Sequence, residues 1–492
     1  MLRPQNQMWM HLSRLHKEFP AWIAAGLSGG TSSPGADATQ VPLADAGDQT
    51  AAAPGAKTLH QSETTSEATS ETTVEQDLEG LAAKLLIPTL SDCPDSQSRQ
   101  NLQDKGQFLA RQERWSDLSQ LIRDADKAQS RTSSGLPEAD LLAYGARSDV
   151  VNAVEHALQD RNDKSAATTT RTGAKDIGGQ KSAGKKSGEN PILIEGVMAL
   201  ESLRRDHPRD IYLTAIVALA HIDIAWTWRA AAADESAGKA KREAQMRRSN
   251  AHFERATTLL APLKDQSRDS AFLSAAQCAL YAGQCADTLE VADAYGALID
   301  QAPDNPRPMR ALGAQMLPRA NGSYAALELE ARRTAARTQH QWGAGGYTWV
   351  YFDAMTIDDQ ACARVDAKFF LDGLQDILCA DPSQEMINLF AAYCAVTLPN
   401  GLGINPSADH NRMEISKAAR WLVRSHLHEL HPLIWAHACQ GFDNNARITS
   451  PRRFAAHGQV KALQCLAYFF RDEINSGHRV TFTPKGFELL PG

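Results

Sequence analysis

The sequence has few of the features that mark enzymes and secreted proteins. Its 492 residues contain no dinucleotide-binding glycine motif and no cysteine–histidine pair at nucleophile spacing. The common signatures of dehydrogenases and of cysteine hydrolases are therefore missing. The eight cysteines never form a Cys-x-x-Cys pair. Dispersed thiols of this kind suit a reducing compartment, so we expect a cytoplasmic protein without a disulfide framework.

An excess of positive charge and a secretory signal are also lacking. Lysine and arginine number 51 against 58 acidic residues, which gives a net charge of −7. Because no basic field is available, we expect no nucleic-acid partner. The apolar run at 21–27 is short and no small-residue cleavage site follows it, so we predict no signal peptide.

One long apolar run, residues 211–228, has the length of a membrane span. It contains His221 and Asp223. An aspartate at mid-membrane costs about 2.5–3.5 kcal/mol even on a lenient insertion scale. We interpret the run as a buried helix of a soluble core, with a membrane segment as the alternative.

Two segments lack the large apolar side chains that a folded core requires. Residues 28–80 are mainly Gly, Ser, Thr, Ala and Glu, and residues 161–190 combine seven basic residues with three acidic ones. Neither can bury enough apolar surface to offset the entropy of ordering, so we predict two disordered linkers, the second one basic. Residues 179–186 resemble a phosphate-binding loop, but Lys186 replaces the magnesium-binding Ser or Thr, and we interpret them as linker.

These linkers divide the chain into an N-terminal peptide (1–27), a small helical block (81–160) and a larger helical domain (191–492). In the peptide, apolar residues recur at three- and four-residue steps from Trp9 to Ile23, which predicts an amphipathic helix. Three roles stay open for this helix: binding a partner, lying on a membrane surface, or docking onto the protein's own body.

Several helical patterns after residue 190 end at a proline, as a helix that closes a hairpin must. The aligned positions are Gly196/Leu200/Leu203/Pro208, Val291/Tyr295/Leu298/Pro303 and Phe370/Leu374/Ile377/Pro382. They resemble the second helix of tetratricopeptide repeats (TPRs), with the pattern Ala-x3-Phe-x2-Ala-x4-Pro. A fourth helix, with Phe253/Ala256/Pro262, fits the pattern with one extra residue. The steps from Phe253 to Tyr295 and from Tyr295 to Leu374 exceed the 34-residue TPR period, which favours an irregular array. We therefore predict an all-α fold: an irregular TPR-like array of antiparallel helix hairpins (α-solenoid), with a short extended or hairpin tail after Gly477.

A second resemblance covers residues 250–360. The stretch from Leu317 to Ser323, with the helix after it, resembles a bacterial family of uncharacterised helical proteins that carries Leu-x-Pro-Arg-Trp-Gly-Gly-Ser at this point. Ala320 and Asn321 stand where that family has Trp and the first Gly. The resemblance implies a helical fold and a bacterial origin, and no activity.

Five residues near this motif are candidate binding residues: Arg319, Trp342, Tyr347, Trp349 and Tyr351. Aromatic residues beside glycines serve as anchors in a binding groove or pack a tight corner between helices. An arginine in a turn contacts a ligand anion or bridges carbonyl groups of neighbouring helices. Both interpretations stay open for each residue.

The densest histidine cluster comprises His426, His428, His431 and His437, together with Glu429. Its His-Glu-Leu-His core is one residue shorter than the His-Glu-x-x-His zinc motif, and Pro432 follows it at once. We interpret it as a polar helix end, with a metal site as the alternative.

Together these observations favour a non-enzymatic helical-repeat scaffold that binds a protein or peptide partner. We assign no catalytic residue, no metal ligand and no cofactor. Two alternatives remain: a metal-dependent or other enzyme with a site near His426–His437 and Arg412, and a peripheral membrane protein that attaches through residues 1–27 or 211–228.

Overall fold

The computed structural model of the chain describes residues 80, 83–90, 94–169, 191–234, 238–442 and 451–492. The predicted N-terminal helix (1–27), residues 28–79 of the first linker, and the loop-like residues 179–186 lie outside these ranges. The described part is mostly helical, which confirms the all-α prediction at this level.

Helices of the N-terminal half are α4 (Pro94–Arg111), α5 (Trp115–Lys127), α6 (Glu138–Thr169), α7 (Pro191–Asp206), α8 (Ile211–Ala232), α9 (Lys239–Leu260), α10 (Ala271–Tyr281), α11 (Thr288–Gln301) and α12 (Pro306–Gln315). Those of the C-terminal half are α13 (Tyr324–Arg337), α14 (Gln339–Trp342), α15 (Gly345–Ile357), α16 (Asp359–Arg364), α17 (Ala367–Ala380), α18 (Gln384–Ala392), α19 (Pro406–Ser416), α20 (Ala418–Trp421), α21 (Pro432–Gln440), α22 (Pro451–Phe469) and α23 (Arg471–Asn475). Short 3₁₀ turns follow α9 at 261–263 and 266–269, and π-helical turns continue α18 (Tyr393–Thr397) and α20 (Leu422–His426).

Local sequence sets the ends of these helices. Short polar side chains accept hydrogen bonds from the first free backbone N–H groups of nine described helices. These capping residues are Asp210, Ser270, Asp287, Asn305, Ser323, Asp358, Asp366, Ser383 and Asn405. At the other end, α7, α11 and α17 each stop two residues before a proline, at Pro208, Pro303 and Pro382. The proline stops predicted from the sequence are confirmed for these three helices.

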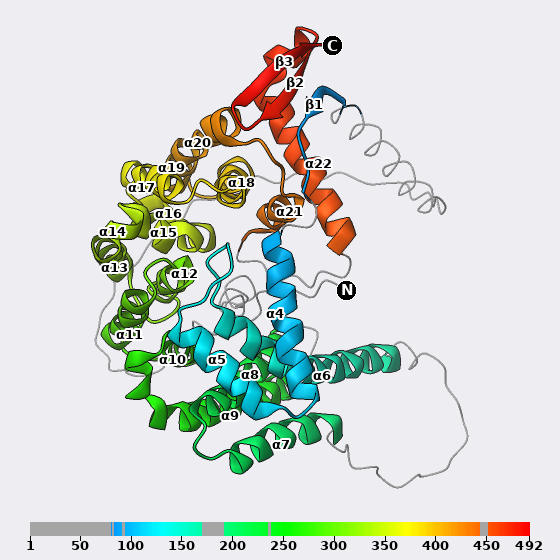
Figure 1. Cartoon of the computed structure of the whole chain (residues 1–492), viewed down its shortest axis with the longest axis vertical. Helices are drawn as coiled ribbons and strands as arrows, with labels where there is room; N and C mark the ends of the chain where they lie inside the picture. The colour runs from blue at the N-terminus through cyan, green and yellow to red at the C-terminus, as the bar shows by residue number, and fades with distance from the viewer. Residues whose placement is uncertain (1–79, 81–82, 91–93, 170–190, 235–237, 443–450) are drawn as a thin grey trace, which may run out of the picture.

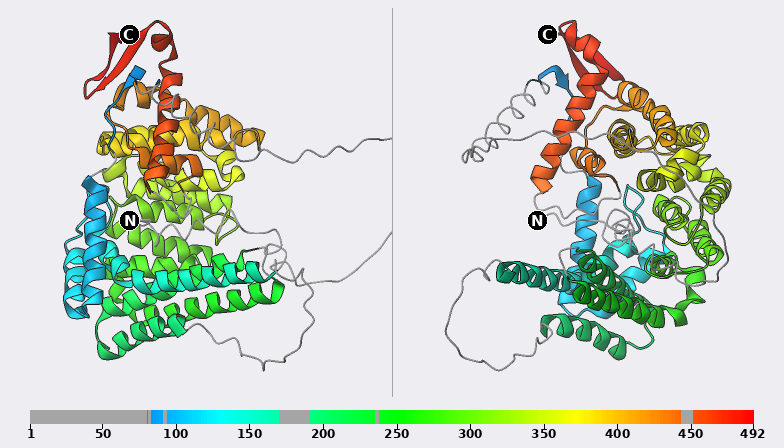
Figure 2. Two further views of the ribbon diagram at one scale, coloured as in Figure 1. Left: turned by 90° about the vertical axis from the view of Figure 1, so that its right-hand side faces the viewer. Right: turned by 180° about the vertical axis from the view of Figure 1, so that it is seen from behind.

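The helices from α8 to α19 follow an arc (Figure 1). Helices α5 to α9 lie at one end of the arc, and α21, α22 and the strands lie at the other. Helix α4 crosses the open side, from α21 to α5 and α6, and the views from the side and from behind agree with this placement (Figure 2). The first described residues therefore lie beside the C-terminal elements, and the helices of the arc come between the two in the sequence.

The strands form one three-stranded sheet in the order β1–β2–β3. Strand β1 (Leu85–Leu86) pairs in parallel with β2 (His478–Thr483), with Leu85 opposite Val480. Strand β2 pairs antiparallel with β3 (Gly486–Pro491), with Phe482 opposite Phe487. The sheet therefore joins the start of the described chain to its C-terminal residues.

The two predicted helical blocks share a hydrophobic core. One cluster combines Leu118, Ile122 and Leu142 of the first block with Ile216 and Phe272 of the second. In addition, α6 continues to Thr169 and so includes the first nine residues, 161–169, of the predicted basic linker. Composition marked these nine residues as linker because they hold no large apolar side chain, but a helix that is already formed can extend at little cost.

Helix α8 is the one described helix that is long and apolar enough to cross a membrane. In the structure 89% of its apolar window is buried against other helices. Its surroundings thus match the predicted buried core helix.

Candidate functional site

The four aromatic candidate residues are buried and form part of the core. Tyr347 is fully buried, Trp349 and Tyr351 are 1% exposed, and Trp342 is 5% exposed. The hydroxyl groups of Tyr347 and Tyr351 both donate to Glu328 Oε2, at 2.9 and 2.8 Å. Burial raises the pKa of both tyrosines, with the Glu328 charge adding to the effect. Their role in this structure is the packed helix corner, and they offer a partner no surface.

Glycines explain how these aromatic residues come to be packed so closely. A Cβ on Gly346 would lie 2.4 Å from Thr338 Oγ1, and one on Gly345 would lie 2.5 Å from Ile377 Cγ1. The two glycines let α15 approach its neighbours with no side chain in between. Arg319, the fifth candidate residue, is exposed in the turn before α13. The five residues therefore do not share one binding face.

The histidine cluster is dispersed by the structure. His431 is buried and its Nε2 lies 2.8 Å from Glu429 Oε1, whereas His426 is exposed and lies edge-on to Trp421. His437 contacts the ring of Phe454 instead, with a centroid distance of 5.0 Å. Among the described residues, no group of three or more His, Cys, Asp or Glu side chains is placed to hold a metal ion.

Arg412, the other residue of the enzyme alternative, is buried inside a structural network. Its guanidinium bonds to Asp359 at 2.5 Å and lies 3.5 Å from Asp409. Burial alone would lower the pKa of Arg412, but the bond to Asp359 outweighs this and the pKa is raised. A permanently charged, paired arginine of this kind holds α16 to α19 and has no proton to exchange.

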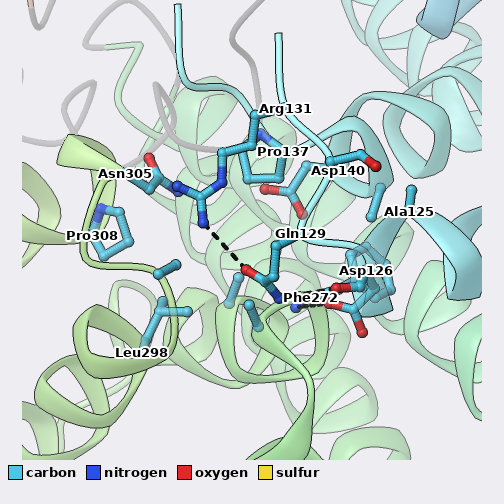
Figure 3. Close-up of a pocket in the computed structure, with 15 residues that line it drawn as sticks. Ala125, Asp126, Gln129, Arg131, Pro137, Asp140, Phe272, Leu298, Asn305 and Pro308 are labelled. Atoms are coloured by element: carbon cyan, nitrogen blue, oxygen red, sulfur yellow. Dashed lines mark hydrogen bonds between the residues drawn. The ribbon is translucent and has the colours of Figure 1, made fainter. Parts of the chain in front are cut away.

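The interior of the arc is occupied by the chain's own loop between α5 and α6. Arg131 of this loop forms an ion pair with Asp304, just before α12. Arg131 also donates to Gln129 Oε1, and Gln129 Nε2 donates to the carbonyl oxygen of Asp126 at 2.9 Å (Figure 3). The Asp126 carboxylate then accepts from the N–H of Phe272 at the start of α10. Polar contacts thus fix the loop to the inner wall of the arc.

The cavity beside this loop is small. Its volume is about 20 Å³, and Pro137, Asp140, Leu298 and Pro308 are among the residues that line it (Figure 3). This is room for roughly one water molecule, because a buried water needs about 10–15 Å³. The inner wall therefore has no space for a small-molecule substrate at this point.

A second contact of the same kind lies at the C-terminal end of the arc. We call residues 83–90 the strap. Leu90 N–H donates to the carbonyl oxygen of Leu430 at 2.9 Å, and Leu430 N–H donates to the carbonyl oxygen of Pro88 at 2.8 Å. Strand β1, within the strap, adds its pairing with β2. A peptide ligand that adds to a sheet edge is held in the same way.

Space remains beside the strap. An open cavity of about 390 Å³ runs along residues 85–89 and is bounded by Gln459 and Leu463 of α22 and by Thr481 and Phe482 of β2. Sequence reasoning missed this groove because its walls come from residues almost 400 positions away along the chain. The short apolar run Leu85-Leu86-Ile87 before Pro88 was the local signal.

A third polar arrangement links α7 to the hairpin of α8 and α9. His221 Nδ1 lies 2.8 Å from His252 Nδ1, and His221 Nε2 lies 3.1 Å from Glu201 Oε1. Arg255 is the last member of this hydrogen-bonded network and donates two bonds to the Glu201 carboxylate, of 2.6 and 2.7 Å. These bonds are compatible when both rings are neutral: His252 donates to His221, which donates to Glu201.

The pKa values of this network follow from its surroundings. The bond from Arg255 lowers the pKa of Glu201 to about 2. Burial lowers the pKa of His221, although Glu201 opposes the change, and burial together with the nearby His221 lowers the pKa of His252 to about 4. At neutral pH the network therefore holds one carboxylate, one guanidinium and two uncharged rings.

Comparison of the chain with protein-family models, with curated proteins and with solved structures finds no match. The resemblances to tetratricopeptide repeats and to the bacterial helical family therefore stay predictions, and function has to be inferred from the geometry.

Proposed function

We propose that this protein is a non-enzymatic helical scaffold that binds an extended segment of a partner protein. We also propose how the helices are arranged: consecutive hairpins form the arc as an irregular TPR-like array. Its support is the arc of α8 to α19 together with the proline stops after α7, α11 and α17.

The proposal is supported mainly by two contacts in which the helical array binds extended segments of the same chain. The strap reaches the C-terminal end through main-chain hydrogen bonds to Leu430 and β2, and Arg131 in the α5–α6 loop is fixed to the inner wall by its ion pair with Asp304. One segment of the chain is thus bound at the C-terminal end of the arc, and the other on its inner wall. Main-chain recognition of this type accepts a segment from another protein equally well.

The surroundings of the other candidate groups favour binding over catalysis. The described histidines and acids form no metal-binding group, and Arg412 is paired with Asp359. We infer a cytoplasmic location from the seven described cysteines, all of which are free thiols. Burial raises the pKa of the thiols of Cys278, Cys362 and Cys394, so these three are inert at neutral pH.

The test is purification of the tagged full-length chain from its native host under mild conditions, followed by size-exclusion chromatography and mass spectrometry. We expect a second polypeptide in near-equimolar amount, which a tag-only control does not retain. A chain that is repeatedly recovered alone and monomeric would contradict the proposal. Elemental analysis of the same sample tests the metal-dependent version of the enzyme alternative, which requires close to one metal equivalent that is lost on combined His428→Ala and His431→Ala substitution.

A further inference from the structure

The strap is held mainly through its backbone. Leu85 and Leu86 lie opposite Val480 and Thr481 in the parallel register, and the two hydrogen bonds between Pro88, Leu90 and Leu430 extend the pairing by four residues. Main-chain bonds do not depend on side-chain identity. The surface that receives the strap therefore sets a path and a direction for a bound segment, and leaves much of its sequence free.

Side chains add a limited requirement. Leu85 is 2% exposed within the main hydrophobic cluster, and Ile87 packs against the same cluster. These residues are two apart, and side chains on one face of an extended segment recur at that spacing. A segment that replaces the strap needs bulky aliphatic side chains at these two positions. It also tolerates proline next to them, because Pro88 contributes only its carbonyl oxygen.

The strap does not fill the groove in which it lies. The cavity of about 390 Å³ beside residues 85–89 is large enough for additional side chains. This space is open to water, and Pro88 and Thr89 of the strap, which line it, are exposed to solvent. An occupant with longer aliphatic side chains at this point would bury more apolar surface than the strap does, and would therefore bind more tightly.

We propose that the groove formed by β2, α22 and residues 427–431 is a docking site for an extended segment of a partner protein, which enters parallel to β2 and displaces the strap. The inference rests on the proposed scaffold function and names the partner's chemistry: an extended segment with aliphatic side chains two residues apart. The strap is the resident occupant. Because it is tethered, its effective concentration is on the order of millimolar, and a partner must bind more tightly than that to replace it.

The experiment uses a fluorescein-labelled peptide with the strap sequence 83–90 and the full-length chain. Leu85→Asp places a charge in the hydrophobic cluster and weakens the intramolecular strap. We expect fluorescence anisotropy to show at least tenfold tighter binding of the peptide to the Leu85→Asp chain than to the unchanged chain. A control peptide with serine at the positions of Leu85 and Ile87 should bind neither.

Circular dichroism and the thermal midpoint establish that the variant is folded, and Ile87→Ser serves as a second strap-weakened chain if it is not. Absence of peptide binding to both folded variants, or equal binding of the serine control, overturns the inference. Light scattering that reveals dimers exchanging their straps also overturns it, because the occupant is then a second copy. If the peptide fails while a partner still co-purifies, the scaffold proposal stands and the groove is excluded as its binding site.

Discussion

The region around α15 and the region around α8 are both deeply buried, but different kinds of side-chain contact stabilise them. Around α15, Trp349, Phe352, Phe390 and Tyr393 contact one another, with ring centroids 4.2–5.8 Å apart. Around α8, the buried helix carries His221 and Asp223 and meets the buried guanidinium of Arg147. The comparison separates two sources of stability: close aromatic packing, which depends on shape, and paired polar groups, which depend on charge and protonation.

The largest effect should come from the ion pair at α8. Arg147 Nε lies 2.7 Å from Asp223 Oδ2, and the two side chains are 0% and 1% exposed. We expect Asp223→Leu to lower the free energy of unfolding by about 3–5 kcal/mol, because it leaves an unpaired guanidinium in the core. Urea denaturation followed by circular dichroism measures the change.

The control is the double variant Arg147→Met with Asp223→Leu, which removes both charges. It should be close to the unchanged protein in stability, since a buried pair gains little over apolar side chains of similar size. Arg147 Nη1, Arg147 Nη2 and Asp223 Oδ1 have no hydrogen-bond partner within the part of the chain that the structure describes, which weakens the pair. A single variant within about 1 kcal/mol of the unchanged protein would contradict the assigned role of the pair.

The next effect tests shape in the α15 region. A Cβ on Gly313 of α12 would lie 1.8 Å from the carbonyl oxygen of Val350 on α15. Gly313→Ala should therefore force the helices apart and cost about 1–3 kcal/mol. Gly196→Ala is the matched control, since Gly196 is also helical but meets only the Val150 side chain, at 3.3 Å. We expect this control to be neutral or to stabilise by about 0.5–1 kcal/mol. Equal thermal midpoints for the two variants would contradict the difference in packing.

Sequence periodicity predicted the helices of both regions, but not the pairing inside them. Helix ends followed from local chemistry, as at Asp287 and Pro303 around α11. The partner of Asp223, by contrast, is 76 positions away on α6, and no local pattern encodes that distance. The aromatic residues 342–351 were left open between core and binding anchors because burial depends on neighbours that a single sequence does not show.

The candidate site was harder to predict than the fold. The strap contacts Leu430 and β2, which follow it by more than 300 residues. Pairings between residues so far apart in the sequence depend on the tertiary structure of the whole array and not on a local pattern. Arg319 was placed beside the aromatic residues by sequence proximity, and the structure leaves it exposed while burying them.

The third effect tests protonation at α8. The pKa of His252 is lowered to about 4 from an ordinary value near 6.5, so the unfolded chain takes up this proton first. The neutral network contributes its full stability above pH 6.5 and loses it as the pH falls towards 4. We expect a loss of about 1–2 kcal/mol between pH 7 and pH 5, measured by urea denaturation at each pH.

His252→Gln should flatten this pH profile, because the amide stays neutral and can still donate to His221. His340→Gln is the matched control: His340 is exposed, and its replacement should leave the profile unchanged. Glu201 and Arg255 also face the pair and stay charged across this range, since the pKa of Glu201 is about 2 and that of Arg255 is raised by its bond to Glu201; Arg204 lies 3.7 Å from Glu201 on the same side. An unchanged profile in His252→Gln would show that other groups cause the acid sensitivity.

The smallest effect contrasts two ion pairs on one helix. Asp149 of α6 lies two residues beyond Arg147 and accepts two bonds from Arg111, of 2.6 and 2.9 Å, but these side chains are 44% and 55% exposed. Arg111→Gln should therefore cost only about 0.2–1 kcal/mol, because water screens the charges and solvates either partner alone. The cost should disappear in 1 M sodium chloride, where the screening length is about 3 Å, whereas the cost of Asp223→Leu should persist.

Urea denaturation at low and high salt measures the unfolding free energy of both variants. A salt-independent effect of Arg111→Gln would mean that Arg111 acts through packing of its aliphatic stem against α6. If both expectations hold, the two ion pairs have similar bond lengths but differ in their contribution to stability, and the difference is due to burial.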